Sequence, residues 1–190
     1  MFKLFFCEVS DEISELPSEI SEHRKEKILS SKSEKNKKLQ IAAASVLKAG
    51  FSSFDVEEKD VTYGTLENGK PIALSHPEIH FSLSHSENMA VAVFSDTPVG
   101  VDCERKDRTV SLDLIKHFFL PEEVEDYKND PPLLWVAGES LSKLSGEGVF
   151  AHNNRTRIPP FVDENTTKAD DVILEKRIIG DNIVVVSYYN

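Results

Sequence analysis

Residues 79–105 read IHFSLSHSENMAVAVFSDTPVGVDCER, and this stretch decides the fold class. Its apolar runs at 79–84 and 89–95 predict two strands with a short connection between them. The residues at 96–98, Asp-Thr-Pro, are typical of a turn, and 99–105 predict a third strand. The middle of the chain is therefore rich in strands.

Helices are expected on both sides of these strands. One apolar stripe predicts a helix over 34–49, and Gly50 is expected to end it. Helical segments are expected near 111–118 and 121–128. The pair Pro131-Pro132 then opens a helix at about 132–145.

Further strands are expected near both ends of the chain. The apolar run from Phe2 to Cys7 is interpreted as a buried N-terminal strand. The segments 171–178 and 182–189 predict two strands joined at Gly180-Asp181, and Asn68-Gly69 is a turn signal. We therefore predict an α+β fold of two halves that share one interface, 1–97 and 98–190, each with strands and a long helix.

Composition narrows the functional classes. The chain has 190 residues, 39% hydrophobic and 29% charged, which is typical of a globular protein. Its net charge of −11 argues against binding nucleic acid or an anionic membrane through bulk charge. No window approaches the roughly 18 apolar residues of a membrane helix. Two cysteines, Cys7 and Cys103, are too few for a disulfide framework, so a reducing compartment, the cytoplasm, is expected.

Positive charge is concentrated between His23 and Lys38. This stretch contains seven Lys or Arg and two Glu, which gives a net charge of +5. This stretch is either a solvated helix face or a small basic patch for phosphates on an otherwise acidic protein. The later segment 64–71, GTLENGKP, is close to a P-loop but departs from it at Pro71, because proline has neither the hydroxyl nor the N–H that a P-loop requires. The interpretation that is left for this segment is a Gly-Lys turn that places one cation near a ligand.

Asp102 and Glu104 lie two residues apart on a predicted strand, so their side chains share one face. Two adjacent carboxylates repel each other unless a cation lies between them, and oxygen ligands favour a hard ion such as Mg²⁺. The alternative is a solvated strand face.

Trp135, Glu139 and Lys143 follow one another at four-residue spacing and so share one helix face. Either Glu139 and Lys143 form a structural ion pair beside a core tryptophan, or Glu139 is a third metal-binding carboxylate. In the second case Lys143 binds phosphate one turn further on.

Taken in order, these segments resemble the Sfp-type 4′-phosphopantetheinyl transferases. Any one motif is weak, whereas the ordered set over residues 69–146 is specific. The matching segments are Gly69-Lys70-Pro71, Phe81-Ser82-Leu83-Ser84-His85-Ser86, Val99-Gly100-Val101-Asp102-Cys103-Glu104, Phe118-Phe119 with Glu122-Glu123, and Trp135-Val136-Ala137-Gly138-Glu139-Ser140-Leu141-Ser142-Lys143 with Gly146.

The resemblance implies a fold of two similar α+β halves about a pseudo-twofold axis, with the active site between them. It implies an enzyme of the magnesium-dependent holo-[acyl-carrier-protein] synthase type. Such an enzyme moves the 4′-phosphopantetheine moiety of coenzyme A to a serine of an acyl or peptidyl carrier protein and releases adenosine 3′,5′-bisphosphate. A monomer with internal pseudo-symmetry, without nucleic-acid or membrane partners, is expected.

The resemblance also implies roles for individual residues. Magnesium would be held by Asp102, Glu104 and Glu139, and Glu139 would act as the base for the serine hydroxyl. Lys143 and His85 would stabilise the phosphate charge. Coenzyme A would be bound by the two residues just named and by Arg24, Lys27, Lys37, Lys38, Lys70 and Ser84, the basic residues of 24–38 taking its 3′-phosphate.

One position departs from the family pattern. A lysine usually precedes the helix glutamate, and this chain has Gly138 there, which removes a cation and costs about 1 kcal/mol relative to alanine in a helix. Two alternatives to an active transferase stay open, and Gly138 motivates the first of them. One is a non-catalytic or weakly active relative that binds coenzyme A or a carrier protein, and the other is an unrelated magnesium-dependent phosphoryl enzyme.

Overall fold

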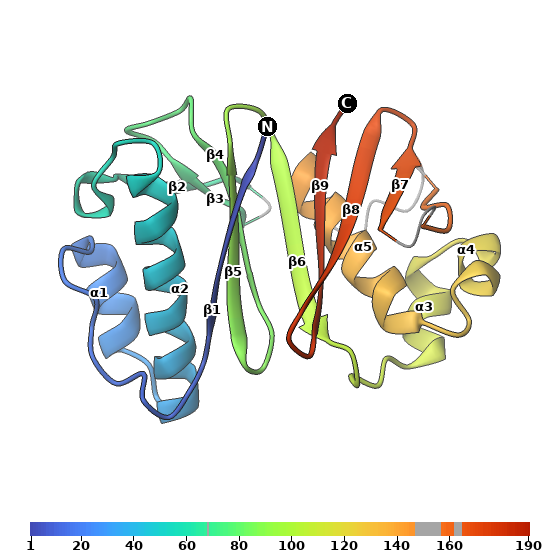
Figure 1. Cartoon of the computed structure of the whole chain (residues 1–190), viewed down its shortest axis with the longest axis horizontal. Helices are drawn as coiled ribbons and strands as arrows, with labels where there is room; N and C mark the ends of the chain where they lie inside the picture. Colours follow the sequence, from blue (N-terminus) through green and yellow to red (C-terminus); the bar gives the residue numbers. More distant parts are fainter. Residues whose placement is uncertain (68, 147–156, 162–164) are drawn as a thin grey trace. The chain divides into compact units, whose positions relative to one another are not determined.

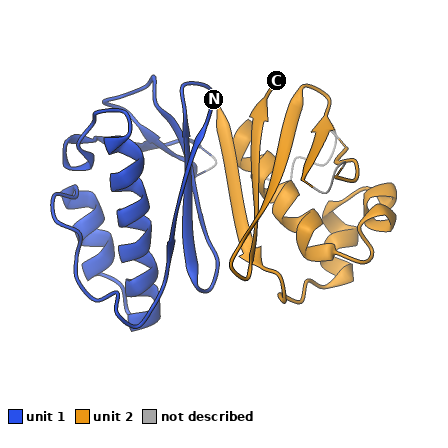
Figure 2. Cartoon of the chain, in the orientation of Figure 1, with its two compact units in different colours: residues 1–97 blue, residues 98–190 orange. Residues whose placement is uncertain are grey.

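The computed structural model describes residues 1–67, 69–146, 157–161 and 165–190. It contains helices and antiparallel sheets, which confirms the α+β class (Figure 1). The chain divides into two compact units, Met1–Thr97 and Pro98–Asn190 (Figure 2). Among the helices that the structure describes, none has the length and apolarity needed to cross a membrane. The pseudo-twofold relation stays a prediction.

The first unit is built on a three-stranded antiparallel sheet of order β1-β5-β4. The predicted strand pair is confirmed as β4 (His80–His85) and β5 (Met89–Ser95). All seven residues of β5 are buried, because β5 is the central strand and apolar residues occupy six of its seven positions. The stacked rings of Phe81 and Phe94, which lie opposite each other in the register, contribute to the core of this unit.

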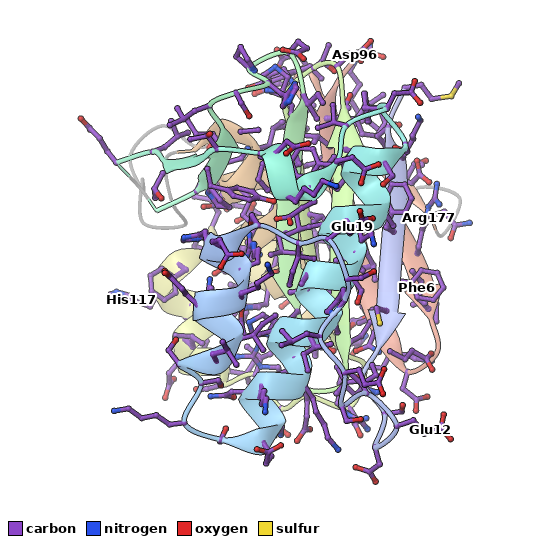
Figure 3. The ribbon with its side chains drawn as sticks, turned by 90° about the vertical axis from the view of Figure 1, so that its left-hand side faces the viewer. Phe6, Glu12, Glu19, Asp96, His117 and Arg177 are labelled. Carbon is purple, nitrogen blue, oxygen red and sulfur yellow. The ribbon has the colours of Figure 1, made fainter. Side chains whose placement is uncertain are left out.

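Strand β1 (Lys3–Glu8) is present, but the prediction that it is buried is wrong. It lies at the edge of the sheet, and each of its six residues is either exposed or half-buried. Phe6 is 52% exposed, and Figure 3 shows its ring beside the strand. An edge strand with one uncovered face buries only alternate side chains, so its apolar run does not indicate full burial.

Helix α2 (Glu34–Ser52) covers this sheet and confirms the predicted helix, but Gly50 does not end it. The helix continues to Ser52, and Gly50 lies where a Cβ atom would be 1.9 Å from the ring of Phe94. Glycine is therefore needed at this position for the close approach of an aromatic ring, and it does not serve as a helix stop.

A second helix, α1 (Glu22–Leu29), packs on α2 and forms a small apolar cluster with it, in which Ile28 meets Ile41 and Ala44. This helix carries the first half of the basic stretch. Most of its residues are charged, and only two, Arg24 and Ile28, are buried. So few buried positions give no apolar periodicity from which the helix could be predicted.

Three short elements complete the first unit. A 3₁₀ helix, η1 (Glu58–Asp60), precedes the hairpin of β2 (Tyr63–Thr65) and β3 (Pro71–Ala73). The predicted turn lies between these two strands. Gly69 has a φ of +89°, a conformation that favours glycine, whereas Asn68 lies outside the described residues.

The second unit has a four-stranded antiparallel sheet of order β6-β9-β8-β7. Strand β6 (Val99–Arg105) and the hairpin of β8 (Val172–Ile179) and β9 (Asn182–Tyr189) confirm the predicted strands. Strand β7 (Thr166–Ala169), a four-residue edge strand with two buried positions, was not predicted. So short a strand carries too little alternation to be recognised.

Three helices accompany this sheet: α3 (Leu112–Phe118), α4 (Pro121–Asp126) and α5 (Pro131–Ser145). All three were predicted, although α4 ends two residues earlier than expected. Helix α5 packs on β6 and β9 (Figure 1). It begins after Asp130, whose side chain accepts a hydrogen bond from the N–H of Leu133.

Candidate functional site

The face of β6 that meets α5 is set by a glycine. A Cβ atom at Gly100 would lie 2.2 Å from the backbone oxygen of Ser140 and 2.7 Å from the backbone nitrogen of Leu144. The backbone of α5 therefore lies directly against the strand. Because side chains alternate along a strand, Asp102 and Glu104 point to the same side as Gly100 and lie next to α5.

Two buried hydroxyl groups hold this helix in place. Ser140 Oγ donates a hydrogen bond of 3.0 Å to Ser187 Oγ, which donates one of 2.8 Å to the Ser140 carbonyl. Ser187 lies on β9, the neighbour of β6, so α5 is fixed to two adjacent strands. The position of the residues on either side of Ser140, Glu139 among them, follows from this packing.

Asp102 and Glu104 of β6 and Glu139 of α5 make up what we call the acidic face of the second unit. Lys143 and Asp102 form its central contact. The Lys143 Nζ lies 2.7 Å from Asp102 Oδ1, and the Asp102 side chain is only 9% exposed. The lysine that the sequence assigned to a phosphate thus contacts a carboxylate in this structure. The same contact shows that the helix face and the strand face meet, as the proposed metal assignment requires.

Glu139 lies in the same neighbourhood. Burial raises the pKa of its carboxyl group, and the negative charge of Asp102 raises it further, whereas the charges of Lys143 and Arg108 lower it. Two carboxylates that repel each other in a half-buried place are a good position for an additional cation.

Arg108 is a residue of this cluster that the sequence analysis missed. Its guanidinium forms an ion pair with Glu104, and its Cζ lies 6.0 Å from the centre of the Trp135 ring. A turn, in which the N–H of Arg108 donates to the Arg105 carbonyl, follows the strand directly. A basic residue four positions after Glu104 was the available signal, but spacing alone does not predict that a turn returns it to the strand.

The three predicted metal ligands meet the chemical requirement for a hard cation, since all of them offer carboxylate oxygens. Asp102 and Glu139 lie close enough for one charge to raise the pKa of the other. Within the described ranges, however, no three His, Cys, Asp or Glu side chains are arranged to hold a metal ion. Protein cations pair with Asp102 and Glu104 instead. The metal assignment therefore stays a prediction.

The first unit contains an open pocket of about 750 Å³. Its wall brings together three residues that the sequence assigned to coenzyme A, Arg24, Lys27 and His85. Partial burial, and secondarily the charge of Arg24, lowers the pKa of Lys27. A concave surface with adjacent cationic groups favours an anionic ligand.

Arg24 is the most informative residue of this pocket. It is only 3% exposed, and among the described residues its buried Nε has no hydrogen-bond partner. A buried N–H without a partner costs about 1–3 kcal/mol, which an anion bound in the pocket would recover.

A buried carboxylate, that of Glu58, holds the tyrosine that lies next to Arg24. Glu58 accepts hydrogen bonds from Tyr63 Oη at 2.6 Å and from the N–H of Ser21 at 2.6 Å. The Arg24 Cζ in turn lies 5.0 Å from the centre of the Tyr63 ring. Burial and the nearby Glu58 raise the pKa of Tyr63, so its hydroxyl stays protonated and donates to the carboxylate.

The other predicted ligands are distributed as follows. Lys70 lies between two residues of the pocket wall, Gly69 and Pro71. Lys38 pairs with Asp11 at 2.7 Å, and Lys37 is half-buried on α2. Ser84 is buried, and its side chain points to the sheet face opposite that of its neighbour His85.

The structure gives a packing reason for the departure at Gly138. A Cβ atom there would lie 2.6 Å from the far edge of the Phe119 ring, which is buried in the core of the second unit. The ring occupies the space that a side chain would need, so the glycine and the phenylalanine fit each other.

We expect Gly138→Ala to destabilise the protein although alanine favours helices by about 1 kcal/mol, because overpacking costs about 1–3 kcal/mol. In a Phe119→Leu background, which removes the far edge of the ring, the same change should be stabilising. Urea denaturation of the four proteins of this double-mutant cycle measures the coupling. Additive effects would show that the ring is not the obstacle.

Sequence comparison identifies the class of protein to which this chain is similar. It is 32% identical over 104 residues to the 4′-phosphopantetheinyl transferase Sfp of Bacillus subtilis, covering 50% of this chain and 46% of that protein. A 4′-phosphopantetheinyl transferase of Aneurinibacillus migulanus is 26% identical over 122 residues, covering 60% of this chain and 48% of that protein. No family model matches the sequence.

A third relative, a 4′-phosphopantetheinyl transferase of Bacillus pumilus, is 32% identical over 99 residues, 48% of this chain and 42% of that protein. The resemblance to the Sfp-type transferases inferred from the motifs is thereby confirmed. The chain spans about half the length of the curated relatives it matches.

Proposed function

We propose that this chain transfers the 4′-phosphopantetheine moiety of coenzyme A to a serine of an acyl or peptidyl carrier protein, with release of adenosine 3′,5′-bisphosphate. The observation that carries the proposal is the meeting of Asp102, Glu139 and Lys143 on the face between β6 and α5. These residues belong to the motifs on which the resemblance to named transferases rests.

The pocket of the first unit is proposed to hold the phosphates of the nucleotide. Arg24 and Lys27 supply positive charge, and the orphaned Arg24 Nε supplies a donor that an anion satisfies. His85 lines the same pocket.

Mg²⁺ would be held by Asp102, Glu104 and Glu139. It would neutralise the negative charge that develops when a pyrophosphate bond breaks. Glu139 is proposed to accept the proton of the serine hydroxyl. Its half-buried carboxylate lies near Asp102 and Lys143, which places a proton acceptor in the proposed site. Lys143 is proposed to stabilise the charge on the phosphate oxygens.

The test is incubation of the protein with coenzyme A, Mg²⁺ and several apo carrier proteins, followed by mass spectrometry of the carrier. We expect a mass increase equal to one phosphopantetheine group and its loss when the acceptor serine is replaced by alanine. An unchanged carrier mass in every case would contradict the proposal.

A non-catalytic relative is the second candidate, and Gly138 with its Phe119 contact favours it, because a cation near the phosphates is lost. This candidate predicts that coenzyme A binds and raises the melting temperature while no carrier changes mass. The two measurements together therefore distinguish it from the transferase.

The pH dependence of coenzyme A binding tests the role of Lys70. Burial lowers the pKa of Lys70 to about 8, so its side chain is cationic below that pH and neutral above it. We expect coenzyme A affinity to fall about tenfold as the pH rises through 8, since a charge-assisted contact is lost. Calorimetric titration at pH 7 and pH 9 measures the change.

Lys70→Arg serves as the matched control for this prediction, because arginine stays charged over the whole range. The fall in affinity between pH 7 and pH 9 should disappear in this variant. A fall of equal size in both proteins would assign the pH dependence to another group.

The reaction is proposed to take place in the cytoplasm, by a monomer. Support for a reducing compartment comes from the small number of cysteines, two in 190 residues, of which Cys103 is buried.

A further inference from the structure

The acidic face of the second unit already contains cations of its own. Two of its three carboxylates have a directly paired partner, Asp102 with Lys143 and Glu104 with Arg108. The third, on Glu139, feels the charge of both cations, which lower its pKa against the effect of burial. Three negative and two positive side chains thus form one cluster.

We propose that Arg108 and Lys143 are built-in counter-ions that compete with a divalent cation for the carboxylates of this cluster, and so set its metal affinity. The inference rests on the proposed function, because it takes Asp102, Glu104 and Glu139 as the ligands. It goes beyond that function in two ways. It gives Arg108 a role, and it explains why the described carboxylates do not form a preformed metal site.

The geometry of Lys143 supports the competition. Its Nζ lies 2.7 Å from an oxygen of Asp102, in a direct ion pair with that carboxylate. A metal ion coordinated by the same oxygen would meet the repulsion of an ammonium group at that distance, and the effect is strong because the Asp102 side chain is only 9% exposed. Metal binding therefore requires Lys143 to move away.

Arg108 has the freedom that such an exchange needs. Its side chain is 38% exposed, compared with 20% for its partner Glu104, and it lies in the turn after β6. Its guanidinium also lies near the Trp135 ring, a face on which it can rest after leaving the carboxylate. Both released cations carry donors that suit phosphate oxygens, and arginine can bind them in a bidentate manner.

Metal binding without substrate tests the inference directly. We would titrate the full chain with Mn²⁺ and measure the free ion by electron paramagnetic resonance, with no coenzyme A present. Arg108→Gln and Lys143→Met each remove one competing cation, and we expect each variant to bind Mn²⁺ about tenfold more tightly than the wild type.

Arg105→Gln is the matched control, because Arg105 pairs with Asp107, outside the cluster. We expect it to bind Mn²⁺ as the wild type does. Melting temperatures of all variants check the fold, and a merely structural role of Arg108 would not tighten metal binding.

Two results would overturn the inference, and they differ in what else they affect. If the wild type and all variants bind Mn²⁺ equally, the counter-ion role is wrong while the metal ligands of the proposed function stand. If none of these proteins binds Mn²⁺, the metal assignment fails together with the inference. Binding of coenzyme A to the wild type is measured separately, and its interpretation does not depend on either result.

Discussion

Asp102→Asn should lower the proposed transfer at least about 100-fold, the size of effect seen when one group that stabilises transition-state charge is removed. Asparagine keeps the shape of the side chain and can still accept a hydrogen bond from Lys143. It removes the negative charge that makes Asp102 a metal ligand and a partner for the ammonium group. The rate of carrier modification at saturating coenzyme A and Mg²⁺ measures the effect.

The same variant should change the ionisation of Glu139 in the metal-free protein. Asp102 raises the pKa of the Glu139 carboxyl group, so its neutralisation should lower that pKa. NMR titration of this carboxyl group without divalent metal measures the shift. This shift is a readout that a loss of stability alone would not produce.

Asp107→Asn is the matched control, because Asp107 is exposed and pairs with Arg105. It makes the same chemical change five residues further along and should leave the transfer rate within about twofold of the wild type. A wild-type rate in Asp102→Asn would remove Asp102 from the proposed site.

The strands and helices that decide the fold could be predicted because their apolar patterns are long. The strand pair at 79–95 and helix α5 are examples, since each buries a face with the expected period. Burial was harder to predict than the elements themselves. An apolar run such as that of β1 has the same composition whether its strand lies in the middle of a sheet or at its edge.

The candidate site was predictable where spacing fixes direction. Alternation along β6 places Asp102 and Glu104 on one face, and four-residue spacing along α5 does the same for Glu139 and Lys143. Whether the two faces meet depends on the tertiary structure, which brings Lys143 into contact with Asp102.

Two further residues could not have been found from spacing. Arg108 reaches the cluster because the chain turns after β6, and Phe119 fills the space over Gly138 because of side-chain packing. Both depend on directions that a local pattern does not contain.

Gly100→Ala should have the largest effect on stability, a loss of at least about 3 kcal/mol, at the upper end of the cost of overpacking. The added methyl group would lie 2.2 Å from the Ser140 carbonyl oxygen and 2.7 Å from the Leu144 nitrogen, both of them backbone atoms of α5. A ring edge can rotate away, but a helix backbone moves only as a whole. The helix must therefore shift away from β6 and separate Lys143 from Asp102.

Urea denaturation measures this loss, and Gly64→Ala is the control. A Cβ atom at Gly64 would be 2.8 Å from the side chain of Leu74, which is 56% exposed and free to move, so we expect a cost below about 1 kcal/mol. Stability equal to that of Gly64→Ala would show that the helix does not rest on the strand at this point, and the meeting of the two acidic faces would lose its structural basis.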